Sequence, residues 1–166
     1  MDVATLDALP EADFVAAVSP LFEGAPRFLA RLAAARPFGS DEALFERALA
    51  IALSLPEAEK VELIDAHPRL GAPRDRVSAL SFREQGYDRE TTEAMAELEP
   101  LNQEYEERFG FRYCVFVDGR PRSELVPVLQ AALAADREAE IRRALSDVVA
   151  IARDRSLSPA GRAGAA

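Results

Sequence analysis

Residues 111–121, FRYCVFVDGRP, form the one stretch of this 166-residue chain with the composition of a β-strand. Aromatic and β-branched side chains dominate it, and Asp118-Gly119 is typical of the turn that ends a strand. A single strand has no second strand with which to form a sheet. The stretch therefore predicts a short extended segment near residues 112–117 within an all-α protein.

Apolar residues recur at helical spacing on both sides of this stretch, between Pro and Gly stops. Ser40 or Asp41 is the expected N-cap of one helix, and Pro56 lies near the start of the next, where its missing N–H costs nothing. Pro100 is expected to kink or restart a later helix. The helical segments are 10–24, 25–37, 39–56, 56–68, 89–110, 123–136 and 137–156. We predict a single-domain multi-helix bundle over residues 1–157, followed by a flexible C-terminal tail at 158–166.

The composition of the chain disfavours several classes of function. The net charge of −9 disfavours binding to nucleic acid, because the phosphate backbone would be repelled. One cysteine excludes an internal disulfide and a multi-cysteine zinc site, which suits a cytoplasmic protein. No apolar run approaches about 20 residues, so no membrane span is expected.

The only histidine of the chain, His67, precedes Pro68. A residue before proline is pushed out of helical geometry, so a helix is expected to end at or before His67. The dipole of that helix would favour a protonated imidazole. A surface histidine that caps the last carbonyl groups is one interpretation, and a general acid/base is the other.

Ser81 and Glu84 have the spacing of a capping box at a helix start. The alternative is that Ser81, Glu84 and Gln85 face a polar anionic ligand there. The two interpretations compete, because a Glu84 fully engaged in the cap could not also hold a ligand.

Arg155 ends an apolar stripe on the last predicted helix, so it is expected to face inward, whereas Arg153 is expected on the outer face. An inward arginine is seldom left unpaired. It would pair with an internal carboxylate, extend its head to solvent at a frayed helix end, or anchor a carboxylate or imide-like edge of a ligand. The stripe consists of Ile141, Leu145, Val148, Ala152 and Arg155.

Cys114 lies in apolar company within YCVFV, which is typical of an inert buried thiol. A metal site is not expected either, because His67 has no second histidine beside it.

Together and in this order, these features resemble the 2-oxo-4-hydroxy-4-carboxy-5-ureidoimidazoline (OHCU) decarboxylases of urate degradation. The similarity extends over roughly residues 10–157. The matching stretches are AHPRLG at 66–71, SFREQ at 81–85, LNQEYEERFGFRYCVFVDGR at 101–120 and ALSDVVAIARDR at 144–155.

The resemblance implies an all-helical carboxy-lyase that needs no cofactor and no metal, is often a homodimer, and forms S-allantoin from a small-molecule substrate. It makes His67 the catalytic general acid/base and Glu84 a second catalytic residue that orients the substrate with Arg155. The substrate-binding positions that it implies are Pro68, Ser81, Gln85, Phe111, Arg112, Tyr113 and Arg155.

This chain also departs from the family's pattern. Arg69 and Ala72 stand where the family usually has Asp and Gly, and Arg112 stands where a proline is common. The segment after Gln85 is shorter than usual. Two alternatives therefore remain open: a decarboxylase of a related ureido or cyclic-amide acid, and a non-catalytic helical domain that binds a partner.

Overall fold

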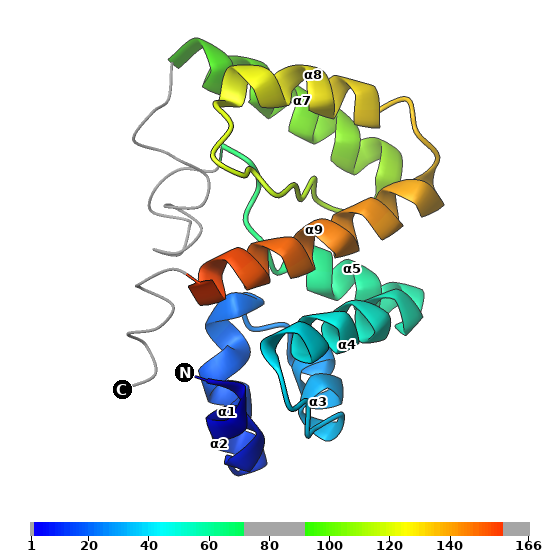
Figure 1. Ribbon diagram of the computed structural model, residues 1–166. Helices are drawn as coiled ribbons and strands as arrows, with labels where there is room; N and C mark the ends of the chain where they lie inside the picture. The colour runs from blue at the N-terminus through cyan, green and yellow to red at the C-terminus, as the bar shows by residue number, and fades with distance from the viewer. Residues whose placement is uncertain (1, 72–91, 158–166) are drawn as a thin grey trace.

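The last helix, α9 (Arg137–Leu157), runs across the middle of the molecule and separates two groups of helices (Figure 1). The computed structural model describes residues 2–71 and 92–157, and within these ranges no residue lies in a strand. The all-α prediction is confirmed. The prediction of a C-terminal tail at 158–166 lies outside the described residues.

The first group lies on one side of α9, and α4, α5 and η1 contact it directly (Figure 1). On the other side α7 packs against α8. The first group consists of α1 (Val3–Ala8), α2 (Glu11–Val18), the 3-10 helix η1 (Ser19–Leu21), α3 (Pro26–Ala34), α4 (Asp41–Ser54) and α5 (Glu57–Asp65), and the second of α7 (Thr92–Phe109) and α8 (Arg122–Ala132).

Local signals in the sequence account for several helix boundaries. Ser40 is the N-cap of α4, and its hydroxyl accepts a hydrogen bond from the N–H of Ala43 at 3.1 Å. Pro56 immediately precedes α5. Pro100 lies inside α7, which continues through it, so the predicted restart does not occur.

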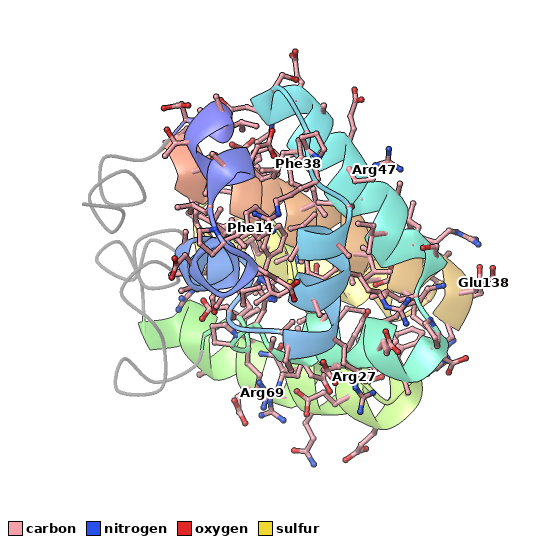
Figure 2. All side chains as sticks on the ribbon, turned by 90° about the horizontal axis from the view of Figure 1, so that it is seen from below. Phe14, Arg27, Phe38, Arg47, Arg69 and Glu138 are labelled. Atoms are coloured by element: carbon pink, nitrogen blue, oxygen red, sulfur yellow. The ribbon has the colours of Figure 1, made fainter. Side chains whose placement is uncertain are left out.

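The apolar stripe of α9 is buried along its whole length, as predicted. Helices α4, α5 and η1 pack on this helix, and the extended segment before α8 is attached to it through Arg143. Phe14 lies among the helices near Phe38, and their ring centroids are 6.1 Å apart, whereas Arg47 and Glu138 reach away from the ribbon (Figure 2). No helix in the described ranges is long and apolar enough to cross a membrane.

Residues 112–117 form the predicted non-helical segment between α7 and α8. It ends in the predicted turn, in which Arg120 N donates to Val117 O at 3.0 Å. Asp118 and Gly119 both have positive φ, at 50° and 68°, which is the geometry of a type I′ turn. The segment is tied to α9 by Arg143, whose Nη1 donates to the carbonyl oxygen of Cys114 at 2.9 Å.

That arginine belongs to a partly buried polar network between α7, α9 and the extended segment. Tyr105 donates from its hydroxyl to Oε2 of Glu140 at 2.7 Å, and Arg143 pairs with Glu140 at 2.8 Å and with Asp147 at 2.8 Å. The Arg143 guanidinium also lies 4.9 Å from the ring centroid of Tyr113. Burial raises the pKa of the Tyr113 hydroxyl to about 12, so this ring stays neutral. The network therefore fixes how the extended segment packs on α9.

Candidate active site

His67 lies two residues beyond the end of α5, as the His-Pro pair predicts. Its side chain is only 3% exposed, so the prediction of a surface histidine is wrong. The carbonyl oxygen of Leu63 lies 3.2 Å from Nδ1 and can only accept, so Nδ1 carries the proton in the neutral ring. Nε2 is buried without a hydrogen-bond partner among the described residues and offers its lone pair.

The environment of His67 favours the neutral ring, contrary to the protonated form expected from the helix dipole. Burial, and then the positive charge of Arg155, lower the pKa of His67 from its ordinary value of 6.5 to about 4. The Glu23 carboxylate and the Leu63 carbonyl oppose this shift. His67 is thus an uncharged proton acceptor near neutral pH.

Arg155 approaches His67 from α9. Its side chain is 2% exposed, so the predicted inward orientation is confirmed, and Arg153 is exposed as expected. Nη1 donates to the carbonyl oxygens of Pro20 and Leu21 at 3.3 and 3.2 Å. Nη2 lies 2.9 Å from Oε1 of Glu23. The guanidinium is therefore held by the turn that follows α2.

Glu23 was not among the site residues that the sequence suggested. It lies between η1 and α3, with a positive φ of 52°, followed by Gly24 at 80°. Glu-Gly after an apolar helix does signal a turn, but no local pattern says which cation the side chain will meet. The pairing arises because η1 packs against α9.

Arg112 reaches the main chain around His67, so these two predicted residues do lie together. Its N–H donates to Oδ1 of Asp65 at 2.8 Å, and its Nη1 donates to the carbonyl oxygens of Asp65 at 2.7 Å and of His67 at 3.3 Å. Burial raises the pKa of the Asp65 carboxyl, and these contacts with Arg112 oppose the shift.

The chain after His67 is attached to α7. Arg69 forms a two-point ion pair with Glu106, with Nε to Oε1 at 2.6 Å, and Asn102 donates from Nδ2 to the carbonyl oxygen of Leu70 at 2.9 Å. Pro68, between them and His67, is half-buried. The unusual Arg69 of this sequence therefore holds the His67 turn against α7.

Phe111 and Tyr113 point into an aromatic cluster with Tyr105, at ring-centroid distances of 5.7 and 5.0 Å. Cys114 is buried, as predicted. The side chains of Phe111 and Tyr113 thus belong to the core, and a wall for a ligand at this point could come only from the backbone.

Ser81, Glu84 and Gln85 lie outside the described residues, as does Ala72. Whether Ser81 and Glu84 form a capping box or face a ligand therefore stays a prediction. Within 2–71 and 92–157, His, Cys, Asp and Glu side chains do not gather in threes around a point that could hold a metal ion.

A helical fold that buries a neutral imidazole beside a guanidinium has the parts of an enzyme site that moves a proton on a small anion. A family model described as OHCU decarboxylase matches residues 7–156. The chain belongs to the OHCU decarboxylase family.

Several relatives support this membership. The chain is 32% identical over 157 residues to the uric acid degradation bifunctional protein PucL of Bacillus subtilis, covering 91% of this chain and 32% of that protein. It is 30% identical over 155 residues to the mouse 2-oxo-4-hydroxy-4-carboxy-5-ureidoimidazoline decarboxylase, covering 89% of this chain and 86% of that protein. The chain thus spans about a third of the bifunctional Bacillus relatives and most of the mouse one.

Solved structures share the fold. A crystal structure of OHCU decarboxylase determined in the presence of (S)-allantoin superposes with a TM-score of 0.69 at 19% identity, covering 82% of this chain and 92% of that one. A crystal structure of (S)-allantoin synthase gives a TM-score of 0.66 at 20% identity, covering 92% of this chain and 51% of that one. At this identity the likeness concerns the fold alone.

Proposed function

We propose that this chain decarboxylates OHCU to (S)-allantoin, with His67 as the group that moves the proton and Arg155 and Glu84 as the groups that orient the substrate. Family membership and the names of the relatives support the reaction. The observation that carries the mechanism is the buried, neutral His67 beside the paired Arg155.

The reaction needs a proton mover and fixed donors. When the bond between C4 and the carboxylate breaks, CO₂ leaves and the electron pair passes into the adjacent C=N system of the ring. The C4 hydroxyl gives up its proton to become the carbonyl of allantoin, and C5 gains a proton on one face. One further proton from solvent balances the charge of the substrate anion. The substrate is its own electron sink, so the chemistry requires no cofactor.

His67 suits the role of the group that moves the proton. Its Nδ1–H faces Leu63, so Nε2 is the atom that can take the hydroxyl proton. The carboxylate of a bound substrate would raise the pKa of the imidazole while it is present. When CO₂ leaves, the negative charge passes to the ring, and the protonated His67 then donates its proton to C5 of that anion.

Arg155 suits the role of a fixed hydrogen-bond donor that orients the substrate. An arginine that gripped the leaving carboxylate would stabilise the ground state more than the transition state. We therefore assign its guanidinium to the imide-like edge of the ring, where negative charge develops. Its contacts with Pro20, Leu21 and Glu23 hold it in place before substrate arrives, which lowers the cost of orientation.

The remaining substrate contacts come from the resemblance. It assigns Glu84 to catalysis and Ser81 and Gln85 to substrate binding. The backbone near Phe111 and Tyr113, together with Pro68 and Arg112, would complete the wall; the contact of Arg112 with the His67 carbonyl supports its part.

The test is to supply freshly generated OHCU and to follow (S)-allantoin by circular dichroism, with the spontaneous rate subtracted. The wild-type chain should accelerate the reaction, and His67→Asn should slow it by roughly 10²–10⁴-fold. Arg155→Ala should weaken substrate binding. Arg153→Ala is the matched control, because it removes an exposed arginine from the same helix.

The outcomes separate the alternatives. A wild-type chain that does not act on OHCU but converts another ureido or cyclic-amide acid would change the substrate. A chain that converts none of them would favour a partner-binding domain. Full activity of His67→Asn would leave the substrate in place and refute the mechanism.

We also propose a cytoplasmic homodimer that acts on a small molecule and binds neither nucleic acid nor membrane. The single cysteine supports a cytoplasmic location. The net charge of −9 supports the proposal that the chain does not bind nucleic acid. Sedimentation equilibrium tests the dimer, and a monomer at all concentrations would contradict it.

A further inference from the structure

We propose that Glu23 is a positioning residue of this site, which fixes the Arg155 guanidinium beside His67 and sets the net charge that the imidazole meets. The inference rests on the proposed function, because it gives Glu23 a part in that reaction. Neither the sequence motifs nor the resemblance singles out this residue.

The first support is the geometry of the pair. Arg155 Nη1 is held by two neutral carbonyl oxygens, of Pro20 and Leu21, whereas Nη2 meets the charged Oε1 of Glu23 at 2.9 Å. The Glu23 side chain is only 15% exposed. A pair so far removed from solvent is weakly screened, so each charge acts strongly on its neighbours.

The second support is the backbone. Glu23 has a φ of 52°, in the left-handed region where a side chain is disfavoured and glycine is not. Its neighbour Gly24 shows that glycine is used in this same turn. Residues that stay in such a conformation cluster at functional sites, where the surrounding structure pays for the strain. The glutamate side chain is thus kept at a position where glycine would fit the backbone better.

The third support is the set of charges around the imidazole. Among the described residues, Arg155 faces His67 from α9, Glu23 from the turn after η1, and the Leu63 carbonyl from α5, while Arg112 contacts the main-chain oxygen. The positive charge of Arg155 lowers the pKa of His67, and the negative charge of Glu23 raises it. Glu23 therefore limits how far Arg155 can weaken His67 as a base.

A specific kinetic signature follows for Glu23→Gln. Glutamine still accepts a hydrogen bond from Nη2, so Arg155 keeps its place, but the negative charge is gone. The substrate anion then meets a more positive site and binds more tightly, while His67 becomes a weaker base. We expect KM to fall several-fold and kcat to fall on the order of tenfold. A purely structural role would raise KM instead.

The single histidine makes the electrostatic part directly measurable without substrate. The Cε1 proton resonance of His67 can be followed by NMR as pH changes, with no other imidazole present. Glu23→Gln should lower the apparent pKa of His67 relative to wild type, and Arg155→Gln should raise it. The double variant should fall between the two single variants, because the opposing charges are both removed.

Two matched controls separate charge and backbone effects. Glu59→Gln removes a carboxylate of similar exposure, 16%, that pairs with Arg31 away from the site, and it should change neither the titration of His67 nor the kinetics. Asp118→Gly relieves the other non-glycine positive φ, of 50°, at an exposed turn. It should match Glu23→Gly in relief of backbone strain and should keep full activity, whereas Glu23→Gly should lose activity.

The proposed function and the role of Glu23 can be refuted independently of each other. A wild-type chain that does not accelerate the reaction would refute the proposed function, and the titrations would still decide whether Glu23 sets the charge at His67. An active wild type with an unchanged His67 titration in Glu23→Gln, or with a raised KM at constant kcat, would overturn the assignment of Glu23.

Discussion

Arg112 forms hydrogen bonds with both the side chain and the main chain of Asp65. Its N–H donates to the side-chain Oδ1 at 2.8 Å, and its Nη1 donates to the main-chain oxygen at 2.7 Å. The same Nη1 reaches the His67 carbonyl at 3.3 Å. The end of α5 and the start of the extended segment are therefore joined directly at the turn that carries the imidazole.

The first prediction concerns this contact. Arg112→Ala should lower the free energy of unfolding by about 1 kcal/mol, since it removes hydrogen bonds to carbonyl oxygens at a partly exposed site. It should also lower kcat, because the His67 turn is held less firmly. Arg112→Pro, the residue common in the family, also removes the N–H to Asp65 and should cost more. Urea unfolding and initial rates measure both effects.

Arg142→Ala is the control for Arg112. This arginine is exposed on α9 and pairs with Glu138 one turn earlier, at 2.6 Å. Exposed pairs of this kind contribute roughly 0.3–0.5 kcal/mol. Equal stability and kcat for the Arg112 and Arg142 variants would show that Arg112 does not hold the turn.

The second prediction concerns the partly buried network of Tyr105, Glu140, Arg143 and Asp147 behind the extended segment. Glu140→Ala should destabilise the fold by about 1–3 kcal/mol, because it removes the acceptor of the buried Tyr105 hydroxyl and one of the two counter-ions of the partly buried Arg143. The triple change Glu140→Leu, Arg143→Met and Asp147→Asn should recover part of that loss, since no isolated charge of this network remains. Urea titrations of the two proteins test this, and a triple variant less stable than Glu140→Ala would contradict it.

The third prediction concerns metal ions. His67 is the only histidine and Cys114 the only cysteine, so nitrogen and sulfur ligands are scarce in this sequence. Initial rates should be unchanged after prolonged dialysis against a chelator. A rate that falls under this treatment and returns with one divalent ion would refute the metal-free mechanism.

Much of the fold follows from local patterns. The stripe on α9 identified the inward Arg155, because a helix surface repeats regularly and one buried face fixes the rest. Pro68 fixed the end of α5 near His67, and Asp118-Gly119 fixed the turn, because both act through the backbone of their own neighbourhood.

The electrostatics of the site could not be predicted in this way. The burial of His67 and the pairing of Glu23 with Arg155 depend on how η1 and α5 pack against α9, which no local spacing encodes. The helix dipole suggested a charged imidazole, but desolvation and a neighbouring guanidinium outweigh it. The sequence therefore indicated which residues to consider and not the protonation state in which they act.

The last prediction uses that protonation state. The pKa of His67 is about 4 in the folded protein and 6.5 is its ordinary value, so the unfolded chain binds the proton more readily. The contribution of His67 to the free energy of unfolding is then fully present above about pH 6.5 and is lost as pH falls towards 4. The shift corresponds to about 3 kcal/mol at most.

His67→Gln isolates this effect from the many carboxylates that also titrate. Glutamine has no such charge, so the variant should lose less stability than wild type between pH 6.5 and 4. The measurement is the free energy of unfolding in urea at several pH values, plotted as the difference between the two proteins. The packing loss of the variant shifts that difference by a constant, whereas its slope with pH reports His67 alone. A difference that stays flat across this range would show that the buried imidazole is not held neutral.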